Sequence, residues 1–88
     1  MKIDVRIFAK KSIFSKYEHI GFLNLGWSDK LEFICPSKGD IITVTENLIR
    51  VWNSEYTNVP LKVQYVRYNY MRDENDEVIL DIIVFVKK

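Results

Sequence analysis

The chain of 88 residues is long enough for one domain with a single hydrophobic core, so we expect residues 1–88 to fold as one unit. Its 13 basic and 12 acidic residues leave a net charge of +1, which excludes a strong overall attraction to nucleic acid or to an anionic membrane. The single cysteine, Cys35, excludes an intrachain disulfide, and no apolar run approaches the roughly 20 residues of a membrane helix. These features predict a soluble protein of the bacterial or host cytoplasm that works away from membranes.

Residues 2–9 alternate apolar and polar side chains, which predicts a half-buried strand. Phe8 is the exception, because it falls on the polar face of this alternation. Residues 10–19 fit two structures: one helical turn capped by Ser12, or a connecting loop that packs its aromatic side chains against the core.

Three short segments follow, with turn residues between them. Residues 19–27 predict a strand that ends in a turn, and residues 31–35 predict another strand. Pro36 ends that strand, and the turn after it contains Gly39, which can take a positive φ, and Asp40, whose side chain can hold the turn. We expect this turn to introduce a further strand and to carry no chemistry of its own.

Residues 43–56 allow two readings. Thr43 and Glu46 have the spacing of a capping box, and Leu48, Trp52 and Tyr56 recur at four-residue steps, which favours a short amphipathic helix. The same residues also fit a hairpin with a two-residue turn.

The last third of the chain predicts a long hairpin, with strands at 61–71 and 77–88 around an acidic turn. The second strand is apolar on both faces, which is typical of a central strand covered on both sides. We expect the 43–56 element or the 12–17 loop to cover its second face. The complete pattern predicts an α+β domain: a small, mostly antiparallel, curled sheet of about five strands with one short helix. The alternative is an all-β, partly open barrel.

Sites for catalysis, metals or cofactors are not expected. His19 and Cys35 lack the third group and the oxyanion site that a nucleophilic pair requires, and one Cys with one His cannot form a structural zinc site. Four acidic residues mark the hairpin turn but lack the ligand spacing of a calcium loop; they are Asp73, Glu74, Asp76 and Glu77. We expect these acids to solvate the turn or to contact a basic partner.

Aromatic and cationic side chains interleave in the strand before that turn and give the candidate partner-binding residues. The candidate set consists of the four acids of the turn together with Tyr65, Arg67, Tyr68, Tyr70 and Arg72. Alternation places Tyr65 and Arg67 on one face with Val63, and Tyr68 and Tyr70 on the opposite face with Val66. A candidate basic edge consists of Lys2, Arg6, Lys10, Lys11 and Lys16.

The pattern Pro-x-x-Gly-Asp-x-Ile, at Pro36, Gly39, Asp40 and Ile42, resembles that of short uncharacterised proteins of bacteria and their phages. The resemblance covers residues 36–88 and implies a small β-rich architecture and a mobile-element origin. The aromatic residues exceed what so small a core readily buries, and exposed Tyr and Trp are typical of binding surfaces. The sequence therefore predicts a non-enzymatic module that binds another protein, as an adaptor, an inhibitor of a host or defence factor, or an assembly subunit. The alternatives are a single-stranded nucleic-acid-binding protein that uses Tyr65 and Arg67, and a structural homo-oligomer or homodimer.

Overall fold

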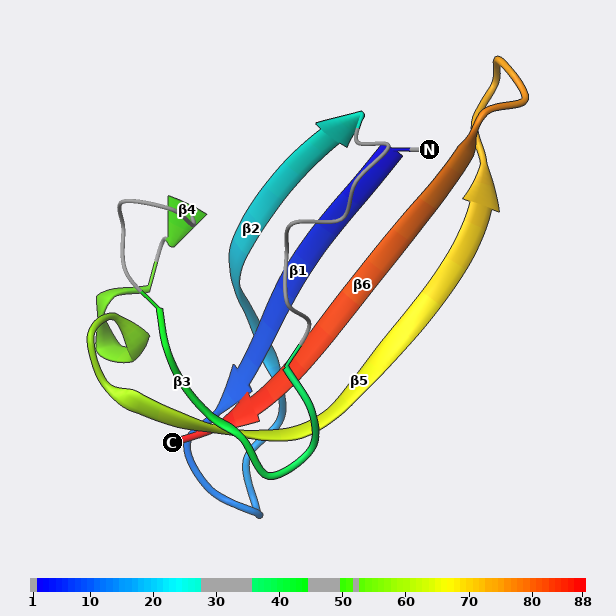
Figure 1. Ribbon diagram of the computed structural model, residues 1–88. Coiled ribbons are helices and arrows are strands. Elements are labelled where there is room, and N and C mark those ends of the chain that lie inside the picture. The colour runs from blue at the N-terminus through cyan, green and yellow to red at the C-terminus, as the bar shows by residue number, and fades with distance from the viewer. Residues whose placement is uncertain (1, 28–35, 45–49, 52) are drawn as a thin grey trace.

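The computed structural model describes residues 2–27, 36–44, 50–51 and 53–88, and it consists mostly of strands. The described strands form one curled six-stranded sheet with the order β3-β5-β6-β1-β2-β4 (Figure 1). Their bounds are β1 (Lys2–Lys10), β2 (Glu18–Trp27), β3 (Ile41–Thr43), β4 (Arg50–Val51), β5 (Pro60–Arg72) and β6 (Val78–Lys87). Neighbouring strands are antiparallel except β1 and β6, which lie side by side and run parallel at the centre of the sheet.

The predicted helix over residues 43–56 is not present in the described part of this segment. Its only described helical turn is the 3₁₀ turn η1 (Ser54–Tyr56), in which the side chain of Asn53 accepts a hydrogen bond from the backbone of Glu55. Thr43 instead pairs with Pro60, and the next residue, Val44, forms a bridge with Thr57. The strand pairing of residues 41–43 and the burial of Val44 outweigh the local capping signal at Thr43. The fold is therefore closer to the all-β alternative than to the α+β domain.

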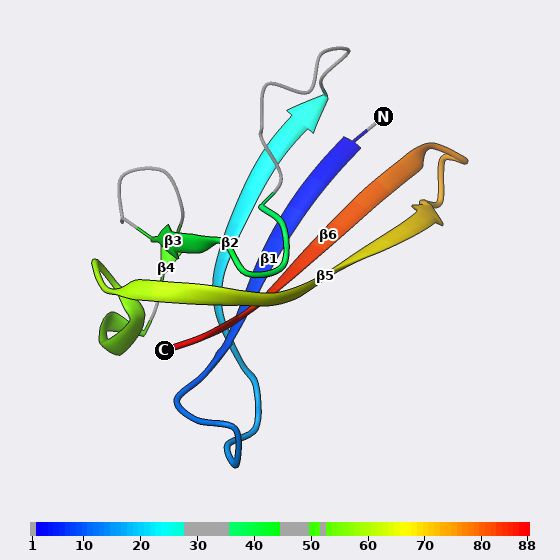
Figure 2. The same ribbon diagram turned by 60° about the horizontal axis from the view of Figure 1, so that its bottom comes forward.

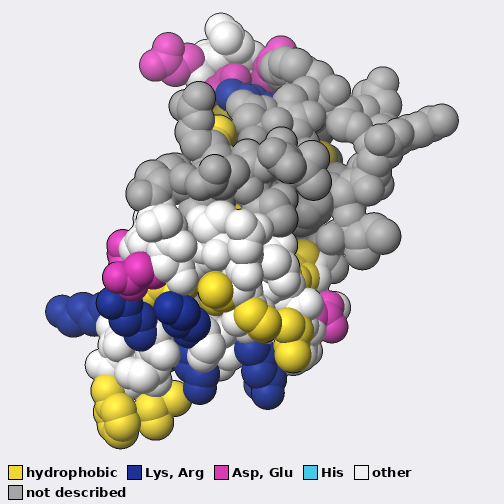
Figure 3. All heavy atoms as spheres, turned by 90° about the vertical axis from the view of Figure 1, so that its left-hand side faces the viewer, with side chains coloured by type: hydrophobic (Ala, Val, Ile, Leu, Met, Phe, Trp, Pro, Cys, Tyr) yellow, Lys and Arg dark blue, Asp and Glu magenta, His cyan; other side chains and the backbone are white. Residues whose placement is uncertain are grey.

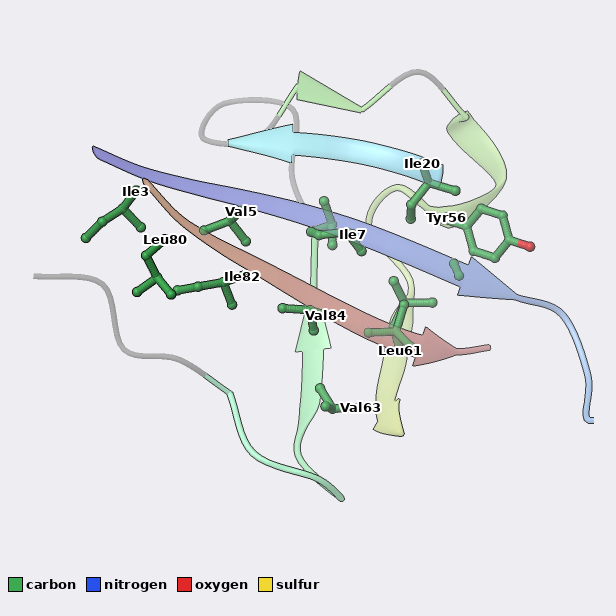
Figure 4. Close-up of a cluster of buried hydrophobic side chains, with 13 residues drawn as sticks. Ile3, Val5, Ile7, Ile20, Tyr56, Leu61, Val63, Leu80, Ile82 and Val84 are labelled. Carbon is green, nitrogen blue, oxygen red and sulfur yellow. The ribbon is translucent and has the colours of Figure 1, made fainter. Parts of the chain in front are cut away.

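The hydrophobic core lies on one face of the sheet, which we call the inner face. β1 places every second residue there, beginning with Ile3, and β6 places Leu80, Ile82, Val84 and Val86 opposite them in register. Figure 4 shows these side chains meeting others from β2, β5 and η1. The remaining members of this core are Ile20, Val44, Tyr56, Leu61 and Val63.

β6 is a central strand that is buried on both faces, as its sequence predicts. The outer face is the opposite side of the sheet, and there β6 buries Asp81, Ile83 and Phe85, which are 4, 5 and 9% exposed. Because the strands on both sides of β6 pair along its length, its backbone groups have partners within the sheet.

The turn before β3 has the predicted geometry and leads directly into that strand. Gly39 has a φ of 93°, which a residue with a Cβ rarely adopts, and the carboxylate of Asp40 accepts a hydrogen bond of 2.8 Å from the backbone of Ser37. Gly39 also donates a backbone hydrogen bond of 2.9 Å to Val63 of β5. The strand predicted at residues 31–35 lies outside the described residues.

A bulge in β5 changes which side chains share a face. The register with β6 skips one residue between Val63 and Tyr65, so Gln64 is the additional residue. Val63 and Val66 consequently both lie on the inner face, where both pack with the core. The prediction that Tyr65 and Arg67 share a face with Val63 was wrong, because a simple alternation of two does not include the inserted residue.

Candidate functional site

Five aromatic rings gather on the outer face and form what we call the aromatic cluster: Phe8, Tyr17, His19, Tyr65 and Phe85. Phe85 of β6 lies at its centre, with the ring of Tyr65 stacked at 4.2 Å between centroids and that of Tyr17 edge-on at 4.9 Å. Phe8 of β1 lies 5.5 Å from Phe85 and stacks on His19 of β2 at 4.7 Å. Four strands and the loop that carries Tyr17 therefore contribute to one continuous group of rings.

Cationic side chains surround the aromatic cluster. The ammonium of Lys10 lies 4.7 Å from the ring centre of Tyr17, and the guanidinium of Arg67 lies 5.7 Å from that of Phe85. Burial raises the pKa of the Tyr17 hydroxyl. Of the two structures that fitted residues 10–19, the loop is the one observed, and through Tyr17 it covers part of the outer face of β6.

An ion pair between Arg6 and Asp81 occupies the outer face beside this cluster. The guanidinium Nε of Arg6 donates a hydrogen bond of 3.1 Å to Oδ1 of Asp81, and its Nη2 contacts the other carboxylate oxygen. The hydrogen bond to Asp81 raises the pKa of Arg6. Asp4 pairs with Asp81 in the register of β1 and β6, so a single guanidinium stands next to two carboxylates.

The predicted basic edge does not exist as an edge, because β1 lies between β2 and β6. Lys2 and Lys10 stand at opposite ends of β1, about 26 Å apart at 3.3 Å per residue. Arg6 is engaged with Asp81, and Lys11 forms a salt bridge of 2.9 Å with Glu55. The five residues therefore do not make one surface.

The second half of β5 exposes large side chains on both faces of the sheet. Tyr65 and Met71 lie on the outer face with exposures of 42 and 47%, and Tyr68 and Tyr70 lie on the inner face with exposures of 50 and 70%. Arg67 and Arg72 are also exposed. The structure thus places the aromatic and cationic members of the predicted partner-binding set on one strand but divides them between its two faces, and the four acids follow in the turn.

We call the side of Tyr65–Arg72 that faces away from β6 the β5 edge. β3 pairs only with the start of β5, from Pro60 to Lys62, and Figure 2 shows it alongside that part alone. Within residues 2–27, 36–44, 50–51 and 53–88, no strand pairs with the β5 edge. A sheet edge of this kind presents backbone donors and acceptors to a second chain.

The acidic residues at the hairpin turn serve first as turn residues. Asp73 accepts hydrogen bonds of 2.9 Å from the backbone amides of Asn75 and Glu77, and Asp76 takes a positive φ of 62°. Arg72 binds Asp76 at 3.2 Å. Among the described residues, no group of three or more His, Cys, Asp or Glu side chains is arranged to hold a metal ion.

Sequence reasoning missed Phe8, Tyr17, Phe85 and Met71 as neighbours of the candidate site. One signal was present: Phe8 breaks the alternation of its strand, and Phe85 lies on the same strand face as Asp81. An aromatic residue on the otherwise polar face of one strand, and an apolar second face on another, indicate a second packed surface, and that is what the outer face contains. Cys35, which was not expected to form a site with His19, lies outside the described residues.

No family model, no curated protein and no solved structure matches the chain. Within the described residues, there is no helix with the length and apolar character needed to cross a membrane.

Proposed function

We propose that this chain is a small, non-enzymatic protein-binding module whose partner adds a strand to the β5 edge. One observation carries the proposal: Tyr65, Tyr68, Tyr70 and Met71 are exposed on both faces of one strand segment. A ligand lying on one face of the sheet would cover only half of these side chains. A strand placed beside β5 covers both faces at once, because its own side chains alternate.

The chemistry of the β5 edge suits a protein partner. Tyrosine contributes a large contact area with few rotatable bonds, and tyrosine and arginine are enriched among residues that dominate binding energies. Arg67 and Arg72 stand beside the tyrosines, and the acidic turn follows directly. An adaptor, an inhibitor of a host or defence factor, or a subunit of an assembly in the cytoplasm would each use such a surface.

A charge at the β5 edge tests this proposal. Tyr70→Lys adds a cation where an incoming strand would pack. Because Tyr70 is 70% exposed in the free protein, the substitution preserves the fold. We expect wild type to recover a protein from its native host and Tyr70→Lys to lose it. Phe14→Ser, in the loop at residues 11–17, is the matched control and should keep the partner.

Amide hydrogen exchange of the complex locates the contact. Amides within residues 65–72 should become protected from exchange when the partner binds, because a strand addition gives them hydrogen-bond acceptors. Protection confined to other strands, with none at the β5 edge, would contradict the proposal. A chain that only associates with itself through this edge in sedimentation, with no other partner, would indicate a structural subunit.

Single-stranded nucleic acid is the second candidate ligand, because Tyr65, Arg67 and Lys10 lie around one aromatic cluster. However, the cluster's rings stack chiefly on one another, and Phe85 at its centre is only 9% exposed. Bases need open ring faces on which to stack. We therefore expect no salt-dependent binding of labelled RNA or DNA. Micromolar binding that falls with added salt and with Tyr65→Ala would favour nucleic acid instead.

A further inference from the structure

We propose that the loop at residues 11–17 docks this protein on an anionic lipid bilayer, with Ile13 and Phe14 inserted among the lipids. These two residues, which we call the apolar tip, are 65 and 92% exposed. Phe14 is the most exposed of the large hydrophobic residues in the described part of the chain. This inference concerns the opposite end of the molecule from the acidic turn and does not depend on the partner at the β5 edge.

The turn that presents the apolar tip is held by hydrogen bonds. The backbone of Ser15 donates to the carbonyl of Ser12 at 3.1 Å, and the backbone of Phe14 donates to the Ser12 hydroxyl at 3.3 Å. The two serine hydroxyls lie 3.1 Å apart and share a further hydrogen bond. The backbone that carries two large apolar side chains is therefore held in a turn, so insertion would not have to order this part of the chain.

Lysines cluster beside the apolar tip at what we call the basic end: Lys10, Lys16, Lys62, Lys87 and Lys88. Lys62, Lys87 and Lys10 form one row across three neighbouring strands, because Lys87 pairs with Lys62 on one side and with Lys10 on the other. Like charges placed directly opposite each other destabilise a sheet. An anionic surface placed against this row of three lysines would neutralise their mutual repulsion.

Figure 3 shows the same arrangement on the surface. Most of the visible Lys and Arg side chains lie together in the lower half of the molecule, next to an apolar projection at its lower end. Among the described residues, the acids at this end are Glu18, which accepts a hydrogen bond from Asn53, and Glu55, which binds Lys11. A third acid, Asp40, lies close to Lys62, because its carbonyl accepts a backbone hydrogen bond from Val63. The five lysines of the basic end thus outnumber the acids around them.

Charge separation along β6 explains why the net charge of +1 does not oppose this docking. The acidic turn precedes the start of β6 and Lys87 ends it, a distance of about 30 Å at 3.3 Å per residue. This is roughly three Debye lengths or more at physiological salt, so the acids are screened from a surface at the basic end. The net charge alone predicted no attraction to membranes, because it is a sum over charges that the fold holds apart.

A bilayer fits this end better than a pocket or a phosphate site on another protein. The apolar tip is a projection, and a fluid lipid surface accepts a projection without a matching cavity. The cations of the basic end are all lysines, which attract phosphate headgroups as point charges, whereas arginine forms the bidentate contacts typical of specific phosphate recognition. A lysine close to an anionic leaflet is attracted to it, and this attraction requires no fixed contact geometry.

Sedimentation with lipid vesicles tests the proposal. We expect wild type to bind phosphatidylcholine vesicles that contain about 30% phosphatidylserine, to bind pure phosphatidylcholine far less, and to dissociate as salt is raised. Phe14→Ser should weaken binding about tenfold, because one large apolar side chain no longer leaves water. Lys16→Gln should weaken it about fivefold, the typical effect of one lysine near an anionic surface. Tyr70→Lys, at the β5 edge, is the control and should bind at least as well as wild type.

Three results would overturn the proposal. The first is no binding to the phosphatidylserine vesicles at micromolar protein. The second is binding that Phe14→Ser leaves unchanged. The third is lipid-independent self-association that both Phe14→Ser and an acidic-turn variant, Glu74→Lys, abolish, because this would place the basic end against the acidic turn of another copy. Loss of the protein partner with Tyr70→Lys and loss of vesicle binding with Phe14→Ser are separate results, so each proposal can fail alone.

Discussion

The two faces of this sheet are built from the same strands but hold together in different ways. On the inner face, β1 and β6 contribute aliphatic side chains that interlock with Leu61 and Tyr56. On the outer face, the same two strands contribute an ion pair, Arg6–Asp81, and rings that pack with Tyr17 and others. A strand of alternating residues can therefore be buried twice, by nonpolar packing on one side and by polar and aromatic contacts on the other.

The contrast predicts that the inner face contributes more to stability, and Ile82→Ala should show the largest effect. Ile82 is 1% exposed and lies within the core, so the substitution leaves a cavity among side chains that cannot close it. We expect the free energy of unfolding to fall by about 3 kcal/mol, measured by urea denaturation. A loss below about 1 kcal/mol would mean that the inner face is not the main core.

Removal of the ion pair on the outer face should have an intermediate effect. Asp81→Ala leaves the guanidinium of Arg6 without the carboxylate that it binds, and Arg6 is only partly exposed to water. We expect a loss of about 2 kcal/mol, less than for a fully buried pair because solvent reaches the guanidinium. A double-mutant cycle with Arg6→Met checks the origin, since the two losses should not add if the pair acts as a unit.

A change within the aromatic cluster should have a smaller effect. Phe85→Leu keeps an apolar side chain at the centre of the cluster but removes its ring contacts with Tyr65, Tyr17 and Phe8. Each such contact contributes about 0.5–1.5 kcal/mol beyond burial, and replacement contacts recover part of it. We expect a loss of about 1 kcal/mol by thermal or chemical denaturation. An effect as large as that of Ile82→Ala would show that the two faces contribute equally.

Alkaline pH should produce the smallest of these effects on stability, through one buried tyrosine on each face. Burial raises the pKa of Tyr56 on the inner face and of Tyr17 on the outer face above the ordinary value near 10. The folded chain then keeps these protons where the unfolded chain loses them, so stability is complete below about pH 10 and falls above it. Tyr56→Phe and Tyr17→Phe should each reduce the slope of stability against pH in that range. A slope unchanged in both variants would contradict this assignment.

The strands were largely predictable from local pattern, because β1, β5 and β6 are long and rich in β-branched residues. The 43–56 segment was not, since its capping and four-residue signals are local while its pairing partners, Pro60 and Thr57, come from the following segment. The parallel pairing of β1 with β6 was likewise outside the reach of a local pattern. Sequence gives the periodicity of a strand, whereas neighbours in a sheet are decided by contacts far along the chain.

The candidate site was predictable in content but not in arrangement. Tyr65, Arg67, Tyr68 and Tyr70 were identified from the sequence. However, the bulge at Gln64 places Tyr65 and Arg67 on the face opposite Val63, where the alternation predicted the same face. Net charge also concealed the separation of lysines from acids along β6. The physical reason is the same in both cases, because neither a sum of charges nor a simple period includes the fold, which decides where each residue lies.

The parallel pairing of β1 with β6 has a consequence for how the chain acquires its structure during synthesis. Arg6 and Asp81 are 75 residues apart, so the centre of the sheet joins a segment made early to one made late. Until β6 leaves the ribosome, a hairpin of β1 and β2 would lack the cover that β6 gives to its inner face and to one edge. The charged residues at alternate positions of β1 keep that nascent hairpin soluble and oppose its pairing with other chains. Because so many contacts span most of the sequence, we expect folding that is slow for a domain of this size and that is completed only after β6 has been made.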